Sequence, residues 1–167
     1  MRHYRLLILI SFTLILSLSA LVQAKEIIGY YPRWQWHDRA DLVNPETIPY
    51  DKLTILTYAF FDPQTDGSIG SNDPLADSQL LEGERSLITL AHQNNTRTIA
   101  SIGGWKGSFN FPELAANSDT RQRFADACIG LIERYGFDGI DIDWEWPGYQ
   151  PHNGTVQDRE NFTRLLQ

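Results

Sequence analysis

Apolar residues recur along this chain with two different periods, and the two periods alternate. Short apolar, β-prone runs predict three strands, at residues 27–31, 52–61 and 96–101. Residues 74–95 and 118–135 instead carry apolar side chains at three- and four-residue spacing, which predicts helices. Strands separated by helices or long connections are typical of an α/β fold with a parallel sheet.

Local signals predict where several of these elements begin and end. Ser118 is the expected N-cap of the long helix and Gly136 its C-cap. Residues 33–49 are rich in Trp, Asp, Asn and Pro, which predicts a loop with at most a short helix after Asn44. Cys128 is the only cysteine and falls on the inner face of the long helix, so no internal disulfide is expected. Residues 158–167 predict the start of a further helix.

A fourth predicted strand, within residues 136–147, differs from the others because its polar side chains are all acidic. A period of two places three carboxylates on one face: Asp141, Asp143 and Glu145. The opposite face is apolar and carries Ile140, Ile142 and Trp144. Since strands of α/β folds are covered on both faces, the carboxylates carry a desolvation cost, which indicates that they have a function.

Three interpretations of this acidic face are open. The first is a solvated edge strand, although the flanking Trp144 and Trp146 disfavour it. The second is a Mg²⁺ or Ca²⁺ site, because both cations prefer oxygen ligands. The third is acid catalysis: Glu145 would lie at the C-terminal end of the strand, where α/β folds place reactive groups. Asp143, about 7 Å back along the strand, would raise the pKa of Glu145 and keep it protonated as a general acid.

The N-terminus predicts a secreted protein. A basic start, an apolar run from residue 6 to 21 and the small residues before Lys25 predict a signal peptide at residues 1–24. Two of the 14 Lys and Arg fall in this segment, which leaves 12 against 21 Asp and Glu, a formal net charge of −9 for residues 25–167. Such an acidic protein is not expected to bind nucleic acid or, after signal cleavage, membranes, whereas a neutral polysaccharide is compatible with its charge.

Four motifs of the chain resemble one enzyme family. Residues 138–145 read DGIDIDWE and resemble the DGxDxDxE signature of the family 18 glycoside hydrolases, the chitinases and their relatives. The family's first three strand motifs are resembled, in order, by IGYY at 28–31, YAF at 58–60 and SIGGW at 101–105. The resemblance implies a (β/α)₈ TIM barrel, of which residues 25–167 form a partial catalytic domain with about the first four β/α units, because a complete barrel takes about 250 residues.

The resemblance implies a secreted chitinase that hydrolyses β-1,4-linked N-acetylglucosamine polymers with retention, using the substrate's own acetamido group as nucleophile. In this scheme Glu145 protonates the glycosidic oxygen and then activates water, and Asp143 holds the acetamido group. Asp141 would hydrogen-bond Asp143 and share its proton, while Asp138 has a structural role at the start of the strand. The scheme needs no metal and no cofactor.

The same motifs imply a binding cleft for chitin or N-acetylglucosamine oligosaccharides. Its expected substrate-binding residues are Tyr30, Phe60, Gly103, Gly104, Trp105 and Trp146. Trp146 stands where many family members have tyrosine and keeps an aromatic wall. Without the resemblance, Tyr30 and Phe60 are equally compatible with core aromatics, and Gly103 with Gly104 is compatible with a plain turn.

Two alternatives accompany the chitinase hypothesis. One is a non-catalytic chitin- or glycan-binding chitinase-like protein or inactive fragment; the other is an endo-β-N-acetylglucosaminidase acting on glycans. The presence of Glu145 favours an enzyme, since lectins of the family lose that acid. The family's later acetamido-binding tyrosine and pocket-floor tryptophan have no counterpart within the 167 residues. Because a half barrel exposes strand edges, we expect residues 25–167 by themselves to self-associate and to show little hydrolysis.

Overall fold

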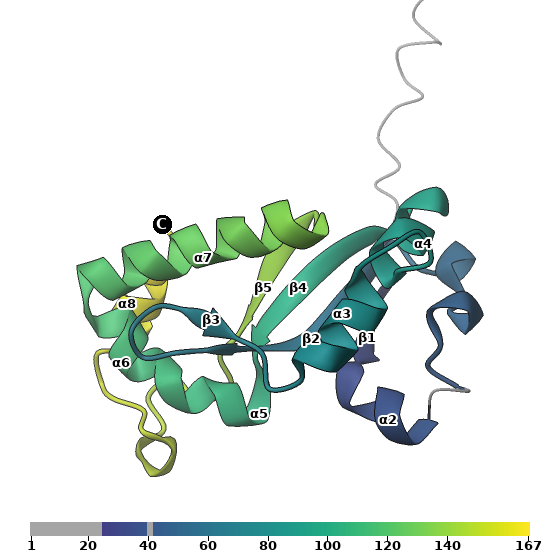
Figure 1. Ribbon diagram of the computed structural model, residues 1–167. Helices are drawn as coiled ribbons and strands as arrows, with labels where there is room; N and C mark the ends of the chain where they lie inside the picture. The colour runs from purple at the N-terminus through teal and green to yellow at the C-terminus, as the bar shows by residue number, and fades with distance from the viewer. Residues whose placement is uncertain (1–24, 40–41) are drawn as a thin grey trace, which may run out of the picture.

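In the part of the chain that the structure describes, four parallel strands form the main sheet (Figure 1). The computed structural model describes residues 25–39 and 42–167, so the predicted signal peptide lies outside the described residues. The sheet order is β1 (Ile28–Pro32), β2 (Ile55–Pro63), β4 (Arg97–Gly103) and β5 (Gly139–Asp143), and the short β3 (Ile69–Gly70) pairs antiparallel with the end of β2. The predicted α/β fold with a parallel sheet is therefore confirmed.

Helices connect these strands. The α-helices are α2 (Trp36–Arg39), α3 (Pro74–Leu81), α4 (Leu87–Gln93), α5 (Gly104–Gly107), α6 (Phe111–Ala116), α7 (Ser118–Tyr135) and α8 (Asp158–Leu165). Single turns of 3₁₀-helix are η1 (Arg33–Gln35), η2 (Pro45–Thr47), η3 (Tyr50–Lys52), η4 (Ser108–Asn110) and η5 (Gln150–His152). Within the described ranges, no helix combines the length and apolar character required to cross a bilayer.

Two of the predicted helix boundaries were wrong. The helix expected at residues 74–95 is divided into α3 and α4, because Gly83 adopts a positive φ of 90° and Ser86 caps a new helix by accepting a hydrogen bond from the Thr89 amide. The N-cap of α7 is Asn117 rather than Ser118, since its side chain accepts from the Asp119 amide. Gly136 ends α7 in the left-handed conformation, as predicted.

The core lies on the side of the sheet that faces the helices. Alternate strand residues, among them Tyr31, Leu56, Tyr58 and Ile102, are buried there against α3, α4, α6 and α7. The apolar face predicted for the fourth strand is part of this core, because Trp144 is buried and its ring stacks on Phe111. The acidic positions of β5 therefore point to the other side of the sheet.

Asp138 joins the start of β5 to the neighbouring strand. Its carboxylate accepts hydrogen bonds from the Thr98 amide at 2.7 Å and pairs with His92 at 2.8 Å. Burial opposes ionisation here, but the hydrogen bonds from Thr98 and His92 outweigh it and lower the pKa of Asp138. The carboxylate thus holds β4 and β5 together at the end opposite the acidic cluster.

Candidate active site

The three carboxylates predicted to act together lie at the C-terminal end of β5. The expected strand was too long by its last acid: β5 ends at Asp143, and Glu145 follows it in the loop. A single hydroxyl fixes the backbone where β5 ends, because Ser108 Oγ donates to the Asp143 carbonyl and accepts from the Glu145 amide, each at 2.9 Å. The backbone of both acids is therefore held from η4, while the Glu145 side chain remains exposed.

Asp141 is held by residues of two other strands. Its Oδ2 accepts hydrogen bonds from Tyr30 Oη at 3.1 Å and from Ser101 Oγ at 2.7 Å. The expected hydrogen bond to Asp143 is not among those formed by the described residues. Burial, reinforced by the charge of Asp141, raises the pKa of Tyr30 to about 12, so the phenol stays protonated and remains a donor.

The charges of the two neighbouring acids act on Asp143. Its pKa is raised first by burial and then by the charges of Glu145 and Asp141. The side chain is half-buried, and on the adjacent strand Gly103 is its register partner. A carboxyl group at this position accepts a proton more readily than a solvated aspartate does.

Replacement of Asp143 by asparagine is expected to stabilise the fold at neutral pH. The folded protein binds a proton at Asp143 at a higher pH than the unfolded chain, so the charged form destabilises the fold above that pKa, and this cost vanishes below the ordinary Asp pKa of about 3.9. Because the group is partly solvated, the gain is at most about 1 kcal/mol. Urea denaturation from about pH 3 to about pH 7 measures it; a variant that is less stable than the parent at pH 7 would contradict the expectation.

Two glycines bring the end of β4 close to the acids and to an aromatic ring. Gly103 has a φ of 119°, and a Cβ there would lie 2.3 Å from the Asp143 carbonyl oxygen. A Cβ on Gly104, whose φ is 71°, would lie 2.8 Å from the Phe60 ring. Any side chain would force these groups apart, so the two glycines are required by close approach as well as by backbone conformation.

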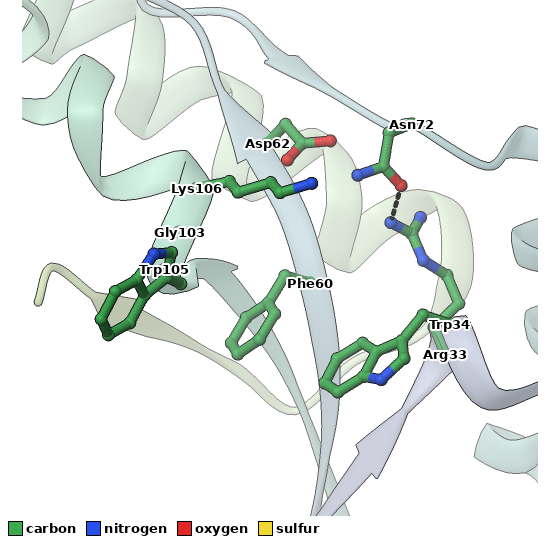
Figure 2. Close-up of a pocket in the computed structure, with 8 residues that line it drawn as sticks. All are labelled: Arg33, Trp34, Phe60, Asp62, Asn72, Gly103, Trp105 and Lys106. Carbon is green, nitrogen blue, oxygen red and sulfur yellow. Dashed lines mark hydrogen bonds between the residues drawn. The ribbon is translucent and has the colours of Figure 1, made fainter.

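An aromatic pocket of about 330 Å³ lies at the ends of β2 and β4, and Figure 2 shows the residues that line it. Its aromatic residues are Trp34, Phe60 and Trp105, and Trp34 stacks on Phe60 with ring centroids 5.9 Å apart. The three carboxylates do not line this pocket. They adjoin it through Gly103, which lines the pocket and pairs with Asp143 across the sheet.

Polar groups form the other side of the pocket. Figure 2 shows Asp62, Asn72 and Lys106 opposite the aromatic rings. Burial raises the pKa of Asp62, although Arg33 nearby opposes the shift. Arg33 also lines the pocket; it is buried and donates to Asn72, so this hydrogen bond fixes one wall of the pocket.

Asp158 closes the loop that follows Glu145. Its side chain is fully buried and accepts hydrogen bonds from the amides of Gly148 at 2.9 Å and Thr155 at 2.8 Å, and from the Thr155 hydroxyl at 2.6 Å. Gly154 completes the closure, since a Cβ there would lie 2.2 Å from the Tyr149 nitrogen. The loop from Gly148 to Thr155 is consequently fixed at the first turn of α8.

Replacement of Asp158 by alanine is expected to lower the free energy of unfolding by about 1–3 kcal/mol, because two backbone amides and one hydroxyl lose their buried carboxylate acceptor. The amides of Gly148 and Thr155 should then exchange with solvent faster, which native-state hydrogen exchange measures directly. Asp126→Ala, on the exposed face of α7, is the control and should change neither quantity. Unchanged protection of the two amides in Asp158→Ala would show that the carboxylate does not hold the loop.

The structure brings every predicted site residue to one end of the sheet. Tyr30 contacts Asp141, Phe60 lies under Gly104, and Trp146 donates its indole N–H to the Trp105 carbonyl at 3.2 Å. The roles assigned to these residues stay predictions. Sequence reasoning did not single out other residues of the site: Trp34, Ser101, Ser108 and His152.

Only one of these four had a usable signal. Ser101 opens the SIGGW motif. The structure places it in register with Asp141 on the neighbouring strand, so both side chains lie on the same face. Trp34, Ser108 and His152 belong to short helical turns whose positions no periodicity predicts. As to metals, residues 25–39 and 42–167 contain no group of three or more His, Cys, Asp and Glu arranged to hold an ion.

Comparisons with known proteins match one protein family over most of the chain. The model of "Glycosyl hydrolases family 18" matches residues 26–167. Chitinase 1 of Aphanocladium album is 35% identical over 153 residues, which cover 83% of this chain and 34% of that protein. A chitinase-like effector of Moniliophthora roreri is 31% identical over 163 residues, covering 96% of this chain and 37% of the effector.

A solved structure agrees in fold as well as in sequence. The group IV chitinase of Ostrinia furnacalis in complex with allosamidin superposes with a TM-score of 0.77 at 31% identity, over 86% of this chain and 39% of that one. The chain spans about a third of the length of the curated relatives described above. With the family model matched over nearly all described residues, and with the acids and glycines of its motifs gathered at one end of the sheet, the chain belongs to glycosyl hydrolase family 18.

Proposed function

We propose that this chain is the acid-bearing part of a secreted chitinase that hydrolyses β-1,4-linked N-acetylglucosamine polymers by substrate-assisted retaining catalysis. One observation carries the proposal: Asp141, Asp143 and Glu145 lie together at the end of β5, beside a pocket with aromatic walls. An acid next to aromatic surfaces suits a sugar polymer, whose ring faces stack on aromatic rings while its glycosidic oxygen needs a proton.

The chemistry follows from Asp143, the last residue of β5, and Glu145 in the loop after it. Glu145 donates its proton to the glycosidic oxygen as the bond to the anomeric carbon breaks, and the leaving sugar departs with that proton. The carbonyl oxygen of the substrate's acetamido group attacks the anomeric carbon and forms a positively charged oxazolinium ion. Asp143 stabilises that charge, and its raised pKa is consistent with a group that exchanges a proton during the reaction. Glu145 then takes a proton from a water molecule. The water oxygen attacks the anomeric carbon and opens the oxazolinium ring, so the product keeps the configuration of the substrate at that carbon.

Comparison of two hexasaccharides tests this mechanism in a full-length protein that carries this chain. N-acetylchitohexaose should be cleaved and should release the β-anomer first, as proton NMR can follow. Cellohexaose, which lacks the acetamido group, should not be cleaved, because no nucleophile is then available. Initial release of the α-anomer, or cleavage of cellohexaose, would rule out substrate assistance.

A second candidate function is supported by the Moniliophthora roreri relative, which is described as a chitinase-like effector. Here the aromatic pocket would bind chitin oligosaccharides without turnover. Calorimetry with N-acetylchitohexaose, combined with an assay for new reducing ends, separates the two candidates. Binding without any hydrolysis by the full-length protein would favour the effector function.

We also propose that residues 1–24 are removed on secretion to the periplasm or the extracellular space. The basic start and the apolar run support this proposal. Mass spectrometry of the exported protein should find Lys25 at the mature N-terminus. A product that retains residues 1–24 would contradict it.

Residues 25–167 by themselves are proposed to self-associate. Strands β1 and β5 are the edges of the sheet, and Ile28 and Tyr30 on β1 are more than half exposed. Exposed edge strands with apolar side chains favour association between copies. Light scattering after size-exclusion chromatography should give a mass above that of the monomer; a monodisperse monomer would refute this proposal.

A further inference from the structure

Five aromatic rings gather in the loops that follow β4 and β5, and His152 lies at their centre. Its imidazole stacks on Trp146 with ring centroids 4.4 Å apart and on Tyr149 at 5.4 Å. Phe109 packs against the same imidazole at 4.8 Å, and Trp105 meets it edge-on at 6.1 Å. One member of this cluster, Trp146, directly follows Glu145 in the sequence.

The imidazole is held by packing rather than by hydrogen bonds through Nδ1. That nitrogen is buried and has no hydrogen-bond partner among the described residues. The faces of Trp146 and Tyr149 stack on the imidazole, and such aromatic contacts stabilise the position of the ring. The His152 ring therefore contacts its neighbours by stacking, and among the described residues it forms no hydrogen bond to the three carboxylates.

Trp146 connects His152 to Trp105, which lines the pocket. Trp146 meets Trp105 edge to face at 4.4 Å and donates its indole N–H to the Trp105 carbonyl at 3.2 Å. Trp105 lines the pocket beside the acids, yet 61% of its surface is exposed. An exposed ring can turn about its side-chain bonds unless neighbours hold it, and here the neighbour is Trp146, held in turn by His152.

The loop also presents an aromatic surface of its own. Tyr149 stacks on His152 and packs at a tilt against Trp146, yet 51% of its surface is exposed. The hydrogen bonds from Gly148 and Thr155 to Asp158 hold the loop in place before any ligand binds. A rigid aromatic side chain in a fixed loop binds with a low entropy cost.

We propose that His152 is a positioning residue that holds Trp146, and through it Trp105, in the orientation that binds sugar, and that the exposed Tyr149 ring beside them adds a further sugar-binding surface. The contacts of His152 with Trp146 and of Trp146 with Trp105 carry the first part, and the exposure of Tyr149 in a loop held by Asp158 carries the second. The inference rests on the proposed function, because it concerns the same binding cleft.

Calorimetry with N-acetylchitohexaose tests the proposal in a Glu145→Gln background of the full-length protein, where turnover does not interfere. His152→Ala should weaken binding roughly three- to tenfold, the worth of a lost aromatic pair, and Tyr149→Ala should weaken it to a similar degree. His152→Phe should bind within about twofold of the parent, because a phenyl ring keeps the stacking. Val156→Ala, in the same loop and 91% exposed, is the control and should bind as the parent does.

A double-substitution cycle separates positioning from general support of the fold. His152→Ala and Trp105→Ala should be non-additive, since both remove the same oriented ring, whereas His152→Ala and Trp34→Ala should add. Unchanged binding in His152→Ala, or additivity with Trp105→Ala, would overturn the role of His152. If the parent binds no oligosaccharide, the proposed function fails with it; if the parent binds and neither His152→Ala nor Tyr149→Ala matters, only this inference fails.

Discussion

Replacement of Glu145 by glutamine is expected to reduce hydrolysis of chito-oligosaccharides by about 10²- to 10⁴-fold, the contribution of a general acid, in a full-length protein that carries this chain. Binding of the same oligosaccharides should persist, because the amide has nearly the shape of the acid. The difference lies in the proton, which the amide can neither donate to the glycosidic oxygen nor take back from water. Turnover from reducing-end release, together with affinity from calorimetry, separates the two effects.

The structure makes this substitution a clean test. The backbone at Glu145 is fixed by the hydrogen bond from its amide to Ser108 Oγ, which a change of side chain does not touch. The side chain is exposed, so the amide leaves no buried group without a partner. Glu160→Gln, an exposed glutamate on α8, provides a matched control that should keep full activity. If Glu145→Gln retains the parent's turnover, another group must supply the proton.

The parts of the site that sequence reasoning predicted are those that depend on local chain geometry. Parity along one strand is enough to place Asp141 and Asp143 together and to bury Trp144 on the other side. The glycine pair at 103 and 104 was expected from its motif, and the structure adds the reason: the Asp143 carbonyl and the Phe60 ring leave no room for a Cβ.

The missing parts depend on contacts between distant segments. Tyr30 donates to Asp141, which lies 111 positions later in the sequence, and the pattern of apolar residues does not predict that the two side chains meet. The prediction of a single helix at 74–95 was wrong for a local reason. Its apolar residues do pack on the core, but Gly83, with its positive φ, separates two helices that pack on the same core. His152 lies in a short 3₁₀ turn, for which the sequence pattern predicts no packing of aromatic rings.

Arg33 is the clearest case of a residue whose role is invisible in sequence. It falls in a segment predicted as a loop, where an arginine is expected to be solvated, yet only 3% of its surface is exposed. Its guanidinium pairs with Asp77 Oδ1 at 2.9 Å and donates to Ser71 at 2.8 Å. Tyr58 donates to the same carboxylate oxygen of Asp77 at 2.7 Å, so the ion pair ties the loop after β1 to β2 and α3.

Replacement of Arg33 by methionine is accordingly expected to lower the free energy of unfolding by about 3–5 kcal/mol, the cost of leaving one member of a buried pair uncompensated. Asp77 would keep its hydrogen bond from Tyr58 but would carry a buried charge without a cation. Urea denaturation followed by tryptophan fluorescence measures the loss. Arg97→Met is the control, because its partner Glu26 and Arg97 itself are both about half exposed, and such a pair contributes less than about 1 kcal/mol.

A second variant shows whether the loss comes from the unpaired charge. Arg33→Met combined with Asp77→Asn removes both charges while the amide oxygen still accepts from Tyr58, so the double variant should be more stable than Arg33→Met alone. Equal losses in the two variants would instead assign the cost to the hydrogen bonds that Arg33 gives to Ser71 and Asn72. Because Arg33 and Asn72 line the aromatic pocket, those bonds link the stability of the fold to the shape of the pocket wall.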